Sequence, residues 1–179
     1  MMSRFILTLM AILMITCSGK GQTDARSQSA AGAPSDWRTY TDKAYDFTIR
    51  YPKTFVILRE LKSRKATTPQ FRHRVRFQDK QLAKGQTAAL EPPQFSIEVL
   101  DKELSLSLRD WLTAVVHIGA EDSVEPFHLD GVGDGLRVRS AMQLAPNEFY
   151  YFVRGKYVFK LTPLGQHSEE MLNSFRLDR

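Results

Sequence analysis

Four histidines, one cysteine and a few paired carboxylates are the side chains of this 179-residue chain with catalytic or metal-binding chemistry. No two histidines stand at the spacing of zinc ligands, and no His-x-x-x-His occurs. No Gly-x-Ser-x-Gly stretch, which marks the nucleophile of many hydrolases, is found either. We therefore expect no enzymatic activity, no metal site and no cofactor. The histidines are His73, His117, His128 and His167.

Two further patterns have an ordinary structural interpretation. Asp101 with Glu103 and Glu121 with Asp122 are paired carboxylates, which we interpret as solvated loop acids. The segment 130–135, Asp-Gly-Val-Gly-Asp-Gly, has the glycine content of a nucleotide-binding loop. A phosphate-binding loop needs the N-terminus of a following helix, whereas the sequence here continues as a strand. We predict a turn.

The most distinctive charged pattern is an alternation of arginine with apolar or aromatic residues over 71–77. Successive side chains of a β-strand point to opposite faces, so the pattern predicts a strand with a wholly cationic outer face. His73 falls on the apolar side and is predicted to be a core histidine. Lys62, Arg64 and Lys65 in the preceding loop would extend the patch. The three strand arginines are Arg72, Arg74 and Arg76.

Charge is unevenly distributed along the chain. The net charge of +5 is too small to indicate a nucleic-acid partner. Residues 50–84 hold 11 Lys or Arg and two acids, whereas residues 101–134 hold eight acids and two bases. Two interpretations follow: the arginine face is solvated or pairs with the acidic segment, or it binds an acidic partner, either an envelope protein or anionic lipid.

The N-terminus has the pattern of an export signal. Arg4 precedes an apolar run over 5–16, which is shorter than the ~20 residues of a membrane-spanning helix. The only cysteine, Cys17, ends this run, which resembles a bacterial lipoprotein signal. We predict a signal peptide over 1–17 and a lipidated Cys17 that anchors the protein to a membrane. An ordinary secretory signal cleaved nearby is the alternative, and both imply export. Residues 18–35, rich in Gly, Ser, Ala and Gln, predict a flexible linker.

Residues 36–179 are predicted to form one α+β domain, an antiparallel sheet sandwiched by helices. Its centre is a hairpin with arms 149–153 and 157–161 around Gly155. One helix is predicted from a capping box at Ser107 to a stop at Gly119, with Trp111 in the core. Ser168 is predicted to cap a short final helix over 169–175. Further strands are expected at 45–52, 55–61, 71–77, 94–101, 124–129 and 136–144.

The residues Tyr-Asp-Phe-Thr-Ile-Arg-Tyr-Pro over 45–52, with Phe55 after them, resemble the opening motif of PsbP-like domains. The closing Met-Leu-Asn-Ser-Phe-Arg over 171–176 is similar to the final helix of that family. Asp46 stands where the family motif has glycine, and Phe55 where it has tryptophan. The resemblance implies an α/β/α sandwich and a family that includes thylakoid-lumen photosystem proteins and bacterial lipoproteins. No metal or catalytic residue maps across.

These observations predict a non-catalytic binding or assembly domain on the periplasmic side of a bacterial membrane. A carrier or sensor of a small or lipidic ligand beneath the 79–93 connection is the alternative, and an enzyme of unrecognised type is the third. A carrier would have a large apolar pocket, and an enzyme a cleft with perturbed titratable groups. An interaction module would have only a surface patch.

Overall fold

The structure is a computed structural model that describes residues 36–58, 70–84, 91–142 and 145–178. Its first strand begins at Trp37, next to the predicted start of the domain. The predicted signal peptide (1–17) with Cys17, the linker (18–35) and the loop residues Lys62, Arg64 and Lys65 lie outside the described residues. Those predictions therefore stay predictions.

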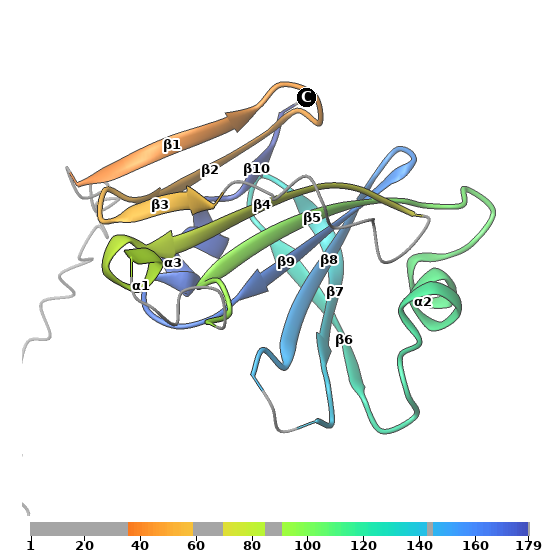
Figure 1. Cartoon of the computed structure of the whole chain (residues 1–179). Coiled ribbons are helices and arrows are strands. Elements are labelled where there is room, and N and C mark those ends of the chain that lie inside the picture. The colour runs from red at the N-terminus through yellow and green to blue at the C-terminus, as the bar shows by residue number, and fades with distance from the viewer. Residues whose placement is uncertain (1–35, 59–69, 85–90, 143–144, 179) are drawn as a thin grey trace, which may run out of the picture. The chain divides into compact units, whose positions relative to one another are not determined.

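The main element is a seven-stranded antiparallel sheet in the order β3-β4-β5-β9-β8-β7-β6 (Figure 1). Strands β5 and β9 are central, so their polar side chains lie far from either edge. Its strands are β3 (Phe55–Leu58), β4 (Phe71–Asp79), β5 (Phe95–Asp101), β6 (Ser123–Leu129), β7 (Gly133–Arg139), β8 (Glu148–Arg154) and β9 (Tyr157–Pro163).

The predicted aromatic hairpin is confirmed as β8 and β9. Gly155 joins them with φ of 55°, a left-handed conformation that glycine adopts without strain. The first arm is buried on both faces, because Phe152 belongs to one hydrophobic cluster and Tyr151 to the other. The apolar side chains of this arm are therefore covered on both faces of the sheet.

A small sheet of β1 (Trp37–Asp42), β2 (Phe47–Pro52) and β10 (Arg176–Leu177) lies beside the large one. Asp46, just before β2, has φ of 49°, a conformation that glycine adopts most easily and aspartate tolerates. The Ser174 side chain binds both backbone groups of Arg50 in β2: its hydroxyl accepts from the Arg50 amide at 3.0 Å and donates to the Arg50 carbonyl at 3.2 Å.

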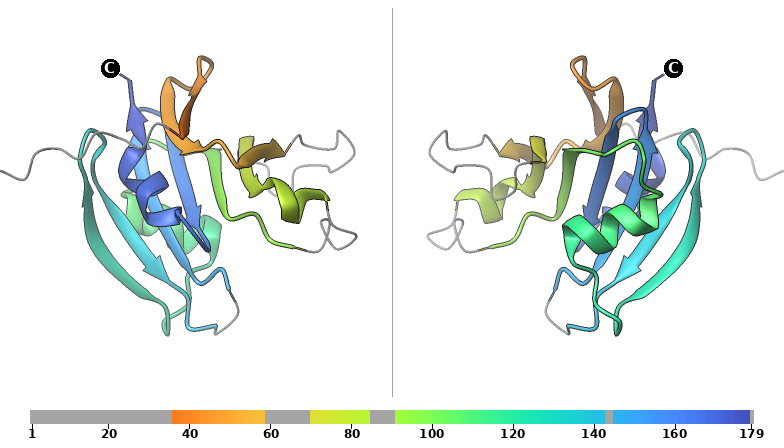
Figure 2. Two further views of the ribbon diagram at one scale, coloured as in Figure 1. Left: turned by 90° about the vertical axis from the view of Figure 1, so that its left-hand side faces the viewer. Right: turned by 90° about the vertical axis from the view of Figure 1, so that its right-hand side faces the viewer.

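Two hydrophobic clusters place the helices on opposite faces of the large sheet (Figure 2). The larger lies between that sheet, the small sheet and helix α3 (Ser168–Ser174), and includes Phe47, Phe159 and Phe175. The smaller lies under helix α2 (Leu108–Trp111) and includes Trp111, which is 1% exposed. The predicted α+β sandwich and the core position of Trp111 are confirmed.

The helix boundaries differ from the predictions. Ser107 caps α2 as predicted, but after Trp111 the chain continues as a π-helical turn, Leu112–Val116. His117, with φ of 60°, ends this turn before Gly119. Ser168 lies inside α3, and His167 with φ of 63° precedes it. Histidine at these two left-handed positions is uncommon, so sequence rules that look for Gly or Ser misplace both ends.

Three smaller differences concern strands and connections. Strand β7 ends at Arg139, short of the predicted end at residue 144. The described part of the predicted 55–61 strand is β3, which ends at Leu58. A short helix, α1 (Lys80–Lys84), occupies the start of the predicted 79–93 connection. None of the helices in the described ranges has the length and hydropathy needed to cross a membrane.

Candidate functional site

A β-bulge separates the arginines that were predicted to share one face of β4. The register of β4 against β5 shifts between Phe71 and His73, so Arg72 is an extra residue in the ladder. Its guanidinium turns to Asp101, with Nε donating to Oδ2 at 2.8 Å. Phe71 instead lies beside Arg74, whose guanidinium is 4.9 Å from the ring centroid. The prediction of one wholly cationic face is therefore wrong: Arg72 lies apart from Arg74 and Arg76.

The first of two polar rows across the sheet holds one acid between two cations. Arg74 on β4, Glu98 on β5 and Lys160 on β9 occupy directly opposite positions in the register. The Arg74 Nε donates to Glu98 Oε1 at 2.6 Å, and the Lys160 ammonium lies 3.3 Å from Glu98 Oε2. The Glu98 side chain is only 15% exposed and sits between two cations. This carboxylate holds both neighbours in place.

The second row lies two residues along the strands and contains no acid. Arg76 is opposite Ser96, and Ser96 is opposite Thr162. Both hydroxyl residues are buried, at 8% and 7% exposure. The Arg76 Nε is buried and has no hydrogen-bond partner, and no carboxylate among the described residues forms an ion pair with Arg76. Within the described part of the chain, this row leaves Arg76 without a counter-charge.

Both rows form the floor of a cleft of about 270 Å³. Its walls come from two loops and a strand: Pro92 and Pro93 before β5, Pro146 before β8, and Phe149 on β8. The buried Gln78 holds one wall, since its Nε2 donates to the Pro92 carbonyl at 3.2 Å. We call this site the cationic cleft; it combines apolar walls with a floor of three cations, one carboxylate and two hydroxyls.

The cleft lies on the α2 face of the large sheet, at a position that α2 does not cover. Tyr151, beside Lys160 in the register, packs under α2 with Trp111 and Leu112. The neighbouring row of polar side chains lines the cleft instead. The uncovered area of the sheet is therefore the polar part of a face whose apolar part is under the helix.

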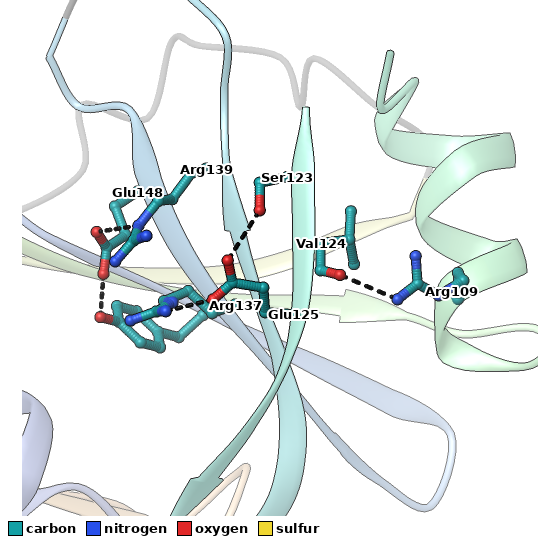
Figure 3. A network of polar contacts seen from close by, with 8 residues as sticks. Arg109, Ser123, Val124, Glu125, Arg137, Arg139 and Glu148 are labelled. Atoms are coloured by element: carbon teal, nitrogen blue, oxygen red, sulfur yellow. Dashed lines mark hydrogen bonds and ion pairs between the residues drawn. The ribbon is translucent and has the colours of Figure 1, made fainter. Parts of the chain in front are cut away.

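A second charged cluster, on the opposite face, spans β6, β7 and β8 (Figure 3). Arg137 donates to Glu125 directly across from it, and Arg139 Nε donates to Glu148 Oε2 at 3.2 Å. The Tyr150 hydroxyl also donates to Glu148. We call these residues the paired rows, because each arginine has its own glutamate.

The paired rows shift the pKa values of their members. The hydrogen bond from Arg137, aided by one from Ser123, lowers the pKa of Glu125. For Glu148, burial acts to raise the pKa, but the hydrogen bonds from Tyr150 and Arg139 outweigh it, so the pKa is lowered. Burial and the bond to Glu148 raise the pKa of Tyr150 to about 12. These shifts arise from satisfied ion pairs, and they support a structural role.

His73 connects the two sheets. Its Nε2 lies 2.9 Å from the buried Asp42 of β1, and its ring stacks on Tyr45 with centroids 5.4 Å apart. Asp42 also accepts from the Ala44 amide at 3.0 Å and from the Tyr40 hydroxyl at 3.0 Å. The histidine is half-buried between the sheets, at the rim of the core in which it was predicted.

Three further predictions concern the glycine-rich segment 130–135, the loop acid Asp122 and metal-binding side chains. The 130–135 segment contains the turn between β6 and β7 and the first three residues of β7. A side chain at Gly135 would come within 2.3 Å of the Tyr151 carbonyl, so strand packing requires this glycine. Asp122, predicted as a solvated loop acid, accepts from the Ala141 amide at 2.8 Å, and that bond lowers its pKa. No group of three metal-binding side chains occurs within the described ranges.

Sequence reasoning identified Arg74 and Arg76 but missed the residues that surround them. Ser96 and Glu98 are the polar alternates of β5, and Lys160 and Thr162 are those of β9, so alternation marked each as facing away from the main core. The missing information was the order β4-β5-β9, which places these alternates beside the arginines. Pairing between strands far apart in sequence is not visible in local patterns.

Comparison with known proteins gives a fold likeness only. No protein-family model and no curated protein matches this sequence. Among solved structures, the chain is similar to the solution structure of cyanobacterial PsbP from Synechocystis sp. PCC 6803, with a TM-score of 0.43 and 12% identity. The match covers 82% of this chain and 95% of that one. Membership of the PsbP-like family stays a prediction from the sequence motifs.

Proposed function

We propose that this protein is an exported, lipid-anchored binding module whose cationic cleft receives an acidic segment of an envelope protein. The observation that carries the proposal is Arg76, a cation at the floor of a cleft without a counter-charge among the described residues. Burying an unpaired polar group is unfavourable, so a bound acid would improve the environment of this guanidinium.

The shape and charge of the cleft favour a protruding acidic segment as the occupant. Three cations and one carboxylate give its floor an excess of positive charge, which attracts an acidic partner. The floor is recessed between proline and phenylalanine walls, and a protein segment can enter this space more easily than a flat bilayer surface. A small free anion is the second candidate, because the cleft is near the lower end of the size range of ligand sites.

The test compares two arginines of the same strand. Full-length protein carrying Arg76→Gln should lose capture of acidic proteins from envelope extract, whereas Arg72→Gln should keep it, because Arg72 faces Asp101 away from the cleft. Capture should weaken as salt is raised, since salt screens charge attraction. Vesicles with anionic lipids serve as the second arm. Capture that survives Arg76→Gln, or vesicle binding that replaces protein capture, would contradict the proposal.

The anchoring part of the proposal rests on Cys17 at the end of the apolar run. Metabolic labelling with a palmitate analogue should tag the protein, and Cys17→Ala should remove the tag. A tag that persists in this variant would show that the lipid, if present, is attached elsewhere.

A further inference from the structure

We infer that the cationic cleft recognises a single carboxylate with an apolar neighbour, held by Arg76 and the hydroxyls of Ser96 and Thr162. This inference rests on the proposed function and specifies the ligand group. It identifies the recognition element as an Asp, Glu or terminal carboxylate next to an apolar side chain.

The two rows on the cleft floor are built alike, with a β5 residue between one residue of β4 and one of β9. In the first row, the β5 position supplies the carboxylate of Glu98, which binds the arginine on β4 and the lysine on β9. In the second row, the β5 position is Ser96, and its neighbours are Arg76 and Thr162. A ligand carboxylate above Ser96 would complete the second row as Glu98 completes the first.

Hydrogen-bonding capacity supports the same placement. A guanidinium has five N–H donors in a planar fork that matches the two oxygens of a carboxylate. The Arg76 Nε is buried without an acceptor, and neither hydroxyl is hydrogen-bonded to another described side chain. The Nε itself is inaccessible, so the part of Arg76 that lines the cleft, together with the two hydroxyls, is what can donate to a bound carboxylate.

The ion pairs of the floor leave one of its cations available to a ligand. Glu98 already engages Arg74 and Lys160, so Arg76 is the cation available to a ligand. Residues two apart on a strand are separated by about 7 Å, so a ligand over Ser96 lies close to the Glu98 carboxylate. A phosphate dianion would be repelled more strongly by Glu98 and also attracted more strongly by the three cations, so charge alone does not separate it from a carboxylate. Phosphate differs because it carries no apolar neighbour to contact the cleft walls.

The walls select an apolar neighbour for that carboxylate. Phe149 and Pro146 form one side of the cleft, and Pro92 and Pro93 contribute further apolar surface. The Lys160 ammonium lies 4.7 Å from the centroid of the Phe149 ring, and this contact holds the ring at the edge of the floor. An aliphatic or aromatic side chain next to the bound acid would bury these surfaces.

The experiment titrates full-length protein with three named probes and follows backbone amide signals of Arg76, Ser96 and Thr162 by NMR. The probes are acetyl-Leu-Glu-Leu-amide, acetyl-Leu-Gln-Leu-amide and inorganic phosphate. The Glu peptide should give saturable shifts at these amides and bind at least about tenfold more tightly than the Gln peptide, because a hydrogen-bonded charge pair is lost. Phosphate should bind more weakly than the Glu peptide.

Matched variants separate the roles of the side chains. Arg76→Gln should abolish the preference for Glu over Gln, whereas Arg72→Gln should preserve it. The double change Ser96→Ala and Thr162→Val should weaken the Glu peptide selectively, with an unchanged unfolding midpoint showing that the sheet is intact.

Several results would overturn the inference. Equal binding of the two peptides, binding of phosphate as tight as that of the Glu peptide, or no saturable shift at millimolar Glu peptide would each do so. If acidic envelope proteins are still captured through Arg76 in any of these cases, the proposed function survives and only the ligand group is wrong. Capture that does not depend on Arg76 contradicts the proposed function itself.

Discussion

The paired rows and the cationic cleft are two arrangements of charge on the same antiparallel sheet. In the paired rows, Arg137 faces Glu125 and Arg139 faces Glu148 directly across neighbouring strands. In the cleft, Arg74 faces Glu98, but Arg76 faces Ser96. The two regions thus differ in what lies across from an arginine: an acid for each arginine of the paired rows, and a serine hydroxyl for Arg76. In the paired rows every arginine is neutralised, whereas in the cleft Arg76 stays available to a ligand.

The difference suggests a division of roles. Opposite charges directly across a strand pair stabilise a sheet modestly, and each arginine of the paired rows has one such partner. The cleft lacks one acid at a place where residues of two loops and β8 flank the floor. We interpret the paired rows as structural and the cleft as a site where a partner supplies the missing acid.

The largest expected effect is a loss of folding stability on the core face of strand β9, which we compare with its cleft face. Phe159 is fully buried in the larger cluster, whereas the adjacent Lys160 faces the cleft. Phe159→Ala should lower the free energy of unfolding by about 3–5 kcal/mol, because it leaves a cavity in a packed core. Urea unfolding followed by circular dichroism measures this change.

Lys160→Ala is the matched control on the same strand. Arg74 still pairs with Glu98 in this variant, so the loss should be no more than about 1 kcal/mol. A loss below about 1 kcal/mol for Phe159→Ala would show that the hairpin is peripheral to stability. Equal losses for the two variants would remove the distinction between a core face and a cleft face.

The next prediction compares the stability change when one hydroxyl is removed from the paired rows and one from the cleft. The Tyr150 hydroxyl donates to Glu148, so Tyr150→Phe should cost about 0.5–1.5 kcal/mol. The Thr162 hydroxyl has no hydrogen-bond partner among the described side chains, so Thr162→Val should leave stability unchanged or slightly raised. A larger loss for Thr162→Val than for Tyr150→Phe would show that the cleft floor is structural.

The sequence predicted the parts of the fold that depend on local alternation. The β8–β9 hairpin, the inward residues of β5 and the core position of Trp111 follow from periods of 2 and 3.6 residues, which are visible without any knowledge of the tertiary structure. The helix ends were wrong because His117 and His167 adopt left-handed conformations that helix-end rules assign mainly to glycine.

The cleft was only partly predictable. The alternation of Arg72, Arg74 and Arg76 was visible, but the bulge at Arg72 was not, because it depends on the register between β4 and β5. Ser96 and Thr162 meet Arg76 only through the order of strands far apart in sequence. Local patterns thus identified the cations, whereas the lack of a described acid paired with Arg76 became visible only in the folded sheet.

The smallest expected effect is a difference in acid sensitivity between the two regions. The folded-state pKa of Glu148 is lowered from its ordinary value of 4.5, despite burial, by the bonds from Tyr150 and Arg139. A carboxylate with a depressed folded-state pKa contributes stability that is present above its unfolded pKa and is lost as the pH falls through its folded pKa. The free energy of unfolding of the wild type should therefore fall as the pH drops below about 5.

Two arginine substitutions assign this acid sensitivity to one region. Arg139→Gln removes a partner of Glu148, which should raise the folded-state pKa of Glu148 and make the fall in stability shallower. Arg76→Gln should leave the slope unchanged, because no described carboxylate pairs with Arg76. Urea unfolding at several pH values between about 3 and 7 measures both slopes. A shallower slope for Arg76→Gln would show that an acid of this chain already neutralises Arg76, and the cleft would then have no need of an acidic partner.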